Sequence, residues 1–589
     1  MNRKKIQAKY KWNLSHIIES DGEWERLFKY VSDNADLLAQ YDGKLDNADS
    51  LLECLQLSDK ISDIVERVYV YAHMKKDEDA SNDKYVAMSD RSSGLAVKLS
   101  SSASFIMPQL SRLSNEVLSN FAKLLQFVDY DYMLAEIIRE KAHILSDAEE
   151  KLLSLSSRAT GNYRDIFGML DNLELPFPKV LDERGKKVQL THGTYSKHLQ
   201  SRDVAVRKSA FDGMYKTFKS YINTISAVYD GSVKKDVFYS TVRKYHNCLT
   251  RALKGDDIPS AVYDKLIDAV SSRLSVLHRY VGYRKQALGL GELHMYDMHT
   301  PIVDGADIKM EYDDAYDLVV ESLAPMGTEY AKLLKEAKDG GWIDVYETKG
   351  KRSGAYSWGT YSAHPYVLLN YQQTTHDIFT IAHEMGHALH SYYSNKFQPY
   401  SKAGYKIFVA EVASTVNEVL LLKYLMRTTT DKAVKKYLLS YYLDMFRTTL
   451  FRQTMFSEFE KFSHELIERD EAISQKVLSD YYYDLNKKYY GKDVIHDDLI
   501  RYEWARIPHF YNSFYVYKYA TGLTAAVSIA SRILSDSSYL PKYFGFLKAG
   551  GSKSPYQILK DADIDLATAK PYDDAMGEFE STLAELERL

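Results

Sequence analysis

The segment that most constrains this chain is His383-Glu384-Met385-Gly386-His387, which has the pattern H-E-x-x-H. In a helix, the two histidines lie one turn apart on the same face, so both imidazole rings reach one metal ion. The glutamate lies at the edge of that face, where it can accept a proton from water at the metal. The pattern therefore predicts a packed helix that carries two ligands and a base.

The residues around this motif favour a helix. Thr374 and Asp377 offer an N-cap and an acidic first turn. Apolar residues then recur at spacings of three and four: Ile378, Ile381, Ala382, Met385, Ala388 and Leu389. The alternative is a chance match with two structural histidines, and the near match that begins at His464 and Glu465 shows how easily one arises. We expect that near match, which lacks the second histidine, on a solvated helix face.

A catalytic zinc site needs a third protein ligand and one position open to water. The run F-V-A-E-V-A-S-T-V-N-E at 408–418 indicates a second apolar helix with Glu411 early in it. Burial of Glu411 without a partner would be costly, and a metal would satisfy it; the alternative is an exposed helix glutamate. Glu418, two turns later on the same face, and Asp377 are candidates for orienting a ligand histidine.

These two segments together resemble the oligoendopeptidase F family of the thimet oligopeptidase-like zinc metallopeptidases. Further matches at Trp12-Asn13-Leu14, 190–195, 354–357, 506–511 and 515–522 extend the resemblance over nearly the whole chain. It implies that the two motif histidines, His383 and His387, bind one Zn²⁺ per chain together with Glu411. It also implies that Glu384 is the catalytic base and proton shuttle.

The resemblance further implies a histidine and tyrosine cluster near the carboxyl end, opposite the metal. His509 matches the histidine. Tyr515 and Tyr519, which share a helix face at i and i+4, are the predicted catalytic tyrosines, with Tyr517 as the alternative. The implied fold is mainly α: a two-lobed, multi-helical shell around a deep channel that admits short, unfolded peptides, with a small β region beside the zinc helix.

Composition narrows the class of protein. With 28 Gly and 12 Pro in 589 residues, long uninterrupted helices are expected. The net charge of -5, without a basic stripe, argues against a nucleic-acid binder. No apolar run approaches membrane-spanning length, and the N-terminus lacks a signal-peptide core. With Cys54 and Cys248 as the only cysteines, these features predict a cytoplasmic protein without membrane partners. The oligomeric state is not encoded in any pattern.

The pattern along the chain predicts two regions. Residues 1–200 are expected to form a helical region with a short β segment at its end, and 201–589 a catalytic metallopeptidase domain. The periodic residues Leu57, Ile61, Ile64, Val65 and Val68 indicate one long helix. A turn is expected at 77–83 and a short strand at 186–190, and helices are expected to resume near residue 201.

A second β region is predicted at 340–373, directly before the motif. Residues 366–371 indicate a strand, and an edge strand there can hold an extended peptide by main-chain hydrogen bonds. The basic loop 349–354 lacks the spacing of a phosphate-binding loop and is interpreted as a hairpin loop, with a mobile lid as the alternative. His364 is a candidate for the lining of a substrate groove or an ordinary loop histidine.

The H-E-x-x-H motif and the resemblance together imply a zinc-dependent oligoendopeptidase that hydrolyses internal bonds of short peptides with Glu384 as general base. One alternative is a carboxypeptidase or dipeptidyl carboxypeptidase on a related shell, which needs a cation such as Arg501 or Arg506 for the terminal carboxylate. The other is a catalytically idle peptide-binding protein. Glu384 counts against it, because a binding protein needs no base beside the ligands.

Overall fold

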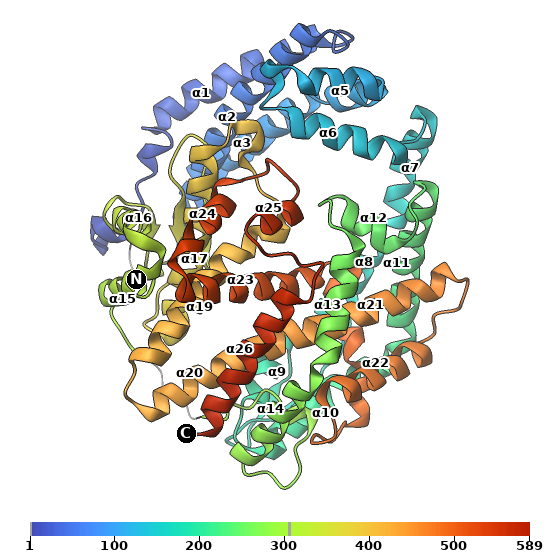
Figure 1. Cartoon of the computed structure of the whole chain (residues 1–589), viewed down its shortest axis with the longest axis vertical. Helices are drawn as coiled ribbons and strands as arrows, with labels where there is room; N and C mark the ends of the chain where they lie inside the picture. Colours follow the sequence, from blue (N-terminus) through green and yellow to red (C-terminus); the bar gives the residue numbers. More distant parts are fainter. Residues whose placement is uncertain (1–2, 304–307) are drawn as a thin grey trace. The chain divides into compact units, whose positions relative to one another are not determined.

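Helices make up nearly all of the regular structure (Figure 1). The structure is a computed structural model that describes residues 3–303 and 308–589. The described residues divide into two compact units, each built from distant parts of the chain. Unit 1 comprises 3–144, 308–425 and 529–564, and unit 2 comprises 145–303, 426–528 and 565–589. The predicted mainly α fold is confirmed, and the predicted division at residue 200 stays a prediction.

Unit 1 begins with long helices, as the scarcity of glycine and proline predicts. Its helices are α1 (Asp21–Asn34), α2 (Ala48–Glu78), α3 (Asp83–Ser102), α4 (Ile106–Arg112), α5 (Asn115–Lys123), α6 (Asp131–Glu140), α15 (Tyr312–Ser322), α16 (Gly327–Asp339), α17 (Thr375–Phe397), α18 (Tyr400–Ala403), α19 (Ile407–Thr428, up to residue 425), α24 (Leu540–Lys548) and α25 (Pro555–Asp561). The predicted turn at 77–83 is confirmed, because α2 ends at Glu78 and Asn82 caps the start of α3.

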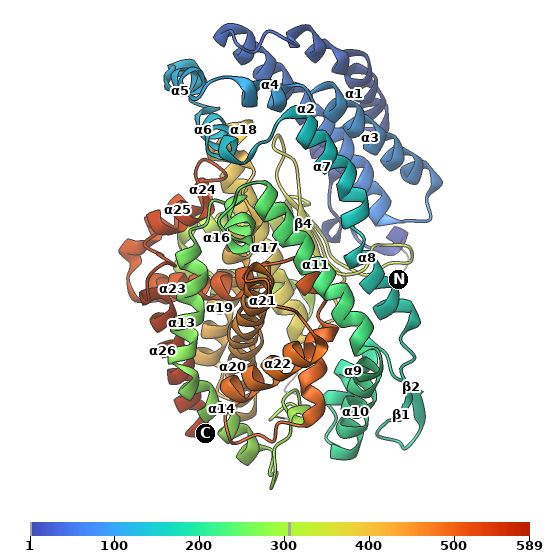
Figure 2. The ribbon, with the colours of Figure 1, turned by 90° about the vertical axis from the view of Figure 1, so that its right-hand side faces the viewer.

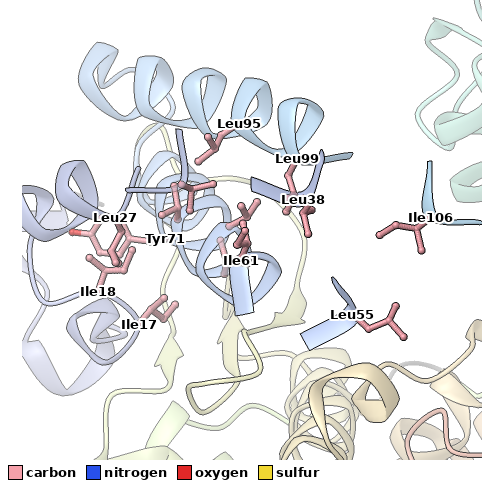
Figure 3. Close-up of a cluster of buried hydrophobic side chains, with 14 of the residues drawn as sticks. Ile17, Ile18, Leu27, Leu38, Leu55, Ile61, Tyr71, Leu95, Leu99 and Ile106 are labelled. Atoms are coloured by element: carbon pink, nitrogen blue, oxygen red, sulfur yellow. The ribbon is translucent and has the colours of Figure 1, made fainter. Parts of the chain in front are cut away.

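The core of the amino-terminal part of unit 1 lies between α1, α2 and α3 (Figure 3). Leu27 of α1, Ile61 and Tyr71 of α2, and Leu95 of α3 are among its buried residues. Trp24 is completely buried, and its indole N–H donates to the carbonyl of Val68 at 2.8 Å. The same cluster includes two residues of strand β5. The apolar core thus connects the first helices to the strands that precede the H-E-x-x-H helix.

A three-stranded sheet precedes α17 and packs against it. Strand β5 (Tyr366–Leu368) pairs in parallel with β3 (Ile343–Asp344) and antiparallel with β4 (Tyr356–Trp358), which gives the order β3-β5-β4. The predicted strand and its place beside the motif helix are confirmed. The expectation that it is an edge strand is wrong, because hydrogen bonds on both sides make it the central strand.

The basic loop 349–354 is fastened to the structure around it. The ammonium group of Lys351 is buried, donates to the carbonyls of Tyr346 and Leu369 at 2.8 and 2.6 Å, and lies 2.8 Å from an Asp344 carboxylate oxygen. The Ala80 N–H donates to the carbonyl of Gly350 at 2.8 Å. These contacts do not fit a mobile lid and favour the interpretation as an ordinary loop.

Unit 2 is a second helical assembly with one short hairpin. Its helices are α7 (Asp147–Thr160), α8 (Tyr163–Met169), α9 (His192–Leu199), α10 (Val204–Ser220), α11 (Ile222–Val242), α12 (Cys248–Lys254), α13 (Ser260–Ser272), α14 (Leu274–Ala287), α20 (Lys432–Met445), α21 (Arg452–Glu468), α22 (Gln475–Tyr490), α23 (Tyr517–Ser535, up to residue 528) and α26 (Lys570–Glu587). The hairpin of β1 (Lys179–Leu181) and β2 (Lys187–Gln189) packs on α10 (Figure 2). The strand predicted at 186–190 is therefore confirmed.

Two expectations for unit 2 are wrong in detail. Helices resume at residue 192 rather than near 201, because Thr191 and Thr194 form a reciprocal capping box that starts α9. His464 is buried rather than solvated, since its ring packs against Phe514 and its Nδ1–H donates to the carbonyl of Glu460 at 2.8 Å. Within residues 3–303 and 308–589, no helix combines the length and apolar character needed to cross a membrane.

Candidate metal centre

The H-E-x-x-H segment lies in the middle of α17, and the start of this helix is defined by its own side chains. Thr374 Oγ1 accepts a hydrogen bond from the Asp377 N–H at 3.2 Å, and Asp377 Oδ2 accepts one from the Thr374 N–H at 2.9 Å. The predicted N-cap is therefore confirmed as a capping box. The prediction that Asp377 orients a ligand histidine is wrong, because its carboxylate accepts a hydrogen bond from the backbone N–H of Thr374 at the start of the helix.

The structure brings His383 and His387 of α17 together with Glu411 of α19. The two histidine Nε2 atoms lie 3.1 Å apart. Glu411 Oε2 lies 3.4 Å from Nε2 of His383 and 3.5 Å from Nε2 of His387. Three potential donor atoms, two nitrogens and one carboxylate oxygen, therefore face one point from two helices.

This geometry can be compared with what a zinc ion requires. Ligand atoms bound about 2.1 Å from zinc at tetrahedral angles lie about 3.4 Å from one another. The three donor–donor distances of 3.1, 3.4 and 3.5 Å are close to that value. Two imidazoles and one carboxylate are also a ligand set of catalytic zinc sites. The residues present therefore fit a zinc ion.

Glu418 holds the ring of His383 in place. The Nδ1–H of His383 donates to Glu418 Oε1 at 2.5 Å. In the neutral imidazole, this bond selects the tautomer with the proton on Nδ1, so the Nε2 lone pair faces Nε2 of His387 and Oε2 of Glu411 and is free to bind a metal. Burial opposes protonation of His383, but Glu418, Glu384 and Glu411 raise its pKa to about 9. The carboxylates therefore make this position favourable for positive charge, and the predicted contact of Glu418 with a motif histidine is confirmed.

Glu384 and Glu411 differ in exposure. The Glu411 side chain is 49% exposed, so the expectation that it needs a metal to offset burial is wrong. Glu384 is buried, and this burial raises its pKa although the neighbouring histidines oppose the rise.

Two residues without a predicted role, Gly386 and Asn417, set how closely α17 and α19 approach each other. Gly386 lets the helices approach so closely that a Cβ atom there would lie 2.5 Å from Cα of Ser414. The amide of Asn417 donates to the carbonyl of Ala382 at 3.1 Å and its oxygen accepts from the Tyr330 hydroxyl at 3.1 Å. A glycine inside the H-E-x-x-H motif and an asparagine in an apolar helix are the sequence signals for such a close approach. The residues that they contact on the other helix cannot be read from the sequence.

Two further histidines near the motif serve packing. His390 is buried, and its ring stacks on Tyr405, just before α19, with ring centroids 3.9 Å apart. His364 stacks on Trp342 at 4.5 Å, donates from Nδ1 to the carbonyl of Pro365, and accepts from Nδ1 of His16 at 2.7 Å. These contacts favour a packed histidine over a lining residue for His364.

The predicted residues near the carboxyl end form a separate group in unit 2. The Tyr519 hydroxyl lies 3.4 Å from Nε2 of His509, and the Tyr515 ring centroid lies 6.3 Å from that of His509 and 5.5 Å from that of Tyr519. Tyr517 is completely buried and packs on Tyr263 instead. The structure thus groups Tyr515 and Tyr519 with the histidine and turns Tyr517 into the core.

Known proteins resemble the chain along its whole length. Residues 197–578 match the model of peptidase family M3, and 109–177 match that of oligopeptidase F. Oligopeptidase PepF of Bacillus subtilis is 42% identical over 100% of this chain and 88% of its own length. Group B oligopeptidase PepB of Streptococcus agalactiae is 38% identical over 100% of this chain and 98% of its own.

Solved structures agree with these matches. A structure from Chlamydophila abortus superimposes with a TM-score of 0.96 at 35% identity and covers 99% of both chains. Oligoendopeptidase-F from Enterococcus faecium, also 35% identical, gives a TM-score of 0.73 over 96% of this chain and 99% of its own. The chain therefore belongs to peptidase family M3 and to its oligoendopeptidase F group, and it is a metallopeptidase.

Proposed function

We propose that this peptidase is a zinc-dependent oligoendopeptidase that cuts internal bonds of short, unfolded peptides. One observation carries the proposal: three possible metal-ligand atoms, from His383, His387 and Glu411, lie 3.1 to 3.5 Å apart. Glu384 directly follows His383 in the chain. The relatives at 38 to 42% identity are named oligopeptidases or oligoendopeptidases, which supports the choice of short peptides as substrates.

His383, His387 and Glu411 would hold the zinc ion. Two imidazoles and a carboxylate favour zinc among the common divalent metals without excluding cobalt or manganese. When bound, the zinc ion supplies Lewis acidity, which lowers the pKa of water and polarises a carbonyl group. Glu418 keeps the His383 ring oriented for this task through its hydrogen bond to Nδ1.

Glu384 acts as the general base in this proposal. It takes a proton from the water that attacks the scissile carbonyl, and it delivers that proton to the leaving amine. Burial raises the pKa of Glu384, which brings it closer to neutral pH, where a base that must also act as an acid is most effective.

His509, Tyr515 and Tyr519 supply hydrogen-bond donors in this proposal. Attack of water on the peptide carbonyl develops negative charge on its oxygen, and preorganised donors stabilise that charge. The hydroxyls of Tyr515 and Tyr519 and the imidazole N–H of His509 are such donors, and the contact between Tyr519 and His509 holds two of them together. Removal of one donor is expected to lower turnover about 100-fold.

The contacts of two arginines weigh against a carboxypeptidase. Arg501 is paired with Asp480 at 2.9 Å and with Asp498 at 2.8 Å. The guanidinium of Arg506 is largely buried and lies 3.9 Å from Glu503. Neither arginine is presented as an open cation for a substrate carboxylate, so an endopeptidase is the better proposal.

Cys54 and Cys248 are buried as free thiols, which suits a reducing compartment. We therefore place the activity in the cytoplasm. Cell fractionation tests this placement, and activity recovered only outside the cell contradicts it.

Replacement of the base tests the mechanism. Glu384→Gln keeps the size of the side chain and leaves the three ligands unchanged, so zinc content by mass spectrometry should stay near one ion per chain. Turnover of a quenched fluorogenic peptide should fall by at least about 100-fold. Glu465→Gln is the matched control, because Glu465 also follows a histidine on a helix but is 44% exposed. Wild-type turnover in Glu384→Gln contradicts the role of base, and loss of zinc from it contradicts a purely chemical role.

A further inference from the structure

The chain is strained directly before Tyr515. Phe514 has a φ of 57°, in the left-handed region that bulky side chains rarely adopt. Such a conformation persists only where the surrounding structure imposes it. Because Phe514 immediately precedes Tyr515, its conformation sets the direction in which the chain enters α23.

A buried carboxyl group contacts the backbone at this residue. Glu460 of α21 is completely buried, and its Oε1 accepts a hydrogen bond from the backbone N–H of Phe514 at 2.9 Å. Among the described residues, its Oε2 has no hydrogen-bond partner. Burial raises the pKa of Glu460 well above its usual value, although the hydrogen bond from the Phe514 N–H opposes this rise, so burial favours the neutral form of the carboxyl group.

Two neighbours reinforce the same point of the chain. The Ser513 hydroxyl donates to Asp236 Oδ2 of α11 at 2.5 Å. The Phe514 ring packs on that of His464, with ring centroids 4.5 Å apart, one turn after Glu460 on α21. Ser513 is thus hydrogen-bonded to α11, and Phe514 is hydrogen-bonded to α21.

Tyr515 and Tyr519, the two tyrosines of the proposed donor group, follow directly after Phe514 in the chain. The N–H groups of Lys518 and Tyr519 donate to the carbonyls of Tyr515 and Val516, both at 3.1 Å, in the first turn of the chain after Phe514. If Phe514 relaxed to a negative φ, the chain after it would turn, and the ring of Tyr515 would leave its place beside His509.

We propose that Glu460 is a positioning residue, which locks Phe514 in its left-handed conformation and thereby holds Tyr515 and Tyr519 beside His509. Glu460 has no contact with substrate in the proposed reaction and acts only through the backbone. This inference rests on the proposed function, because it explains how His509, Tyr515 and Tyr519, the three proposed hydrogen-bond donors, are held in position.

Two variants separate the hydrogen-bond acceptor of Glu460 from its acidic proton. Glu460→Gln keeps the Oε1 acceptor and removes the acidic proton, so kcat should stay within about twofold of wild type. Glu460→Leu keeps a similar volume and removes the acceptor. A displacement of the tyrosines by about 1 Å costs up to about 100-fold in rate, so kcat should fall at least tenfold. KM should change little and zinc content should stay unchanged, because Glu460 is not among the proposed ligands.

Hydrogen exchange provides a readout apart from activity. Peptides that cover 507–516 should exchange faster in Glu460→Leu than in wild type, and as slowly as wild type in Glu460→Gln. If Glu460→Leu does not fold, exchange in the wild type still decides: the Phe514 amide should be protected like the core, and rapid exchange there overturns the proposal.

Tyr515→Phe and Tyr519→Phe distinguish failure of this inference from failure of the proposed function. If these variants lose turnover while Glu460→Leu keeps it, the positioning role is overturned. If Glu460→Gln and Glu460→Leu lose turnover equally, the acceptor is not what matters, and the proposal is also overturned. If both tyrosine variants keep wild-type turnover, the donor role fails, and exchange of the Phe514 amide alone decides whether Glu460 locks the chain.

Discussion

The close approach of α17 and α19 at Gly386 predicts that Gly386→Ala inactivates the enzyme without touching a ligand. An added Cβ would lie 2.5 Å from Cα of Ser414, 2.8 Å from the carbonyl oxygen of Ala413 and 2.9 Å from the N of Ser414. All three are backbone atoms, so no side chain can swing away. Ordinary carbon contacts are about 3.5 Å, so α19 must move by about 1 Å.

That movement carries Glu411, which lies one turn before Ser414 on the same helix. Its distances of 3.4 and 3.5 Å to the two motif histidines should lengthen by up to about 1 Å. A misplacement of this size can cost about 100-fold in rate. Overpacking should also lower the free energy of unfolding by about 1 to 3 kcal/mol.

The assay is kcat/KM on a quenched peptide, with zinc content and thermal unfolding of the same preparation. Gly94→Ala in α3 is the matched control, because nothing lies within 4 Å of a Cβ atom there. It should keep full activity and gain up to about 1 kcal/mol from the better helix propensity of alanine. Activity of Gly386→Ala within about twofold of wild type would refute the claim that the helix spacing sets the ligand geometry.

Further predictions concern the support of the site and the stability of each unit. Glu418→Ala should weaken zinc binding about 10- to 100-fold, measured by chelator competition, and unchanged affinity contradicts its orienting role. Lys351→Met leaves the buried carboxylate of Asp344 without one of its cations and should destabilise the protein by about 3 kcal/mol in urea unfolding; an unshifted midpoint contradicts this. Burial opposes ionisation of Glu503, but Arg452 and its other partners lower its pKa to about 2. The stability that this pair contributes is therefore complete above about pH 4.5 and is lost as the pH falls toward 2. The thermal unfolding temperature of Glu503→Gln should therefore depend less on pH in that window than that of the wild type. An equal pH dependence of the two proteins contradicts the assignment.

The motif helix could be predicted because its determinants are local. The capping residues Thr374 and Asp377 and the apolar spacing lie within one segment, and each local signal agrees with the helix that forms. The contact of Glu418 with a motif histidine could also be predicted, since two periodic helices leave few faces for their charged residues.

The features that escaped prediction depend on partners far away in the chain. The approach of Gly386 to Ser414 is set by how two helices pack, and the burial of His464 depends on Phe514, 50 residues later. The central place of β5 depends on strands that pair with it from both sides. Local patterns give the type of an element, but its neighbours decide which face is covered.

Zinc-dependent cutting inside short peptides is the central claim, and one measurement tests it directly. A mixture of peptides about 5 to 20 residues long, beside intact casein, is incubated with the protein, and the products are identified by mass spectrometry. The same reaction is run with a chelator and again after zinc is restored. Internal cuts confined to the peptides, lost with the chelator and regained with zinc, are predicted. Products trimmed only from the carboxyl end, or no cleavage by zinc-loaded protein, would contradict the account.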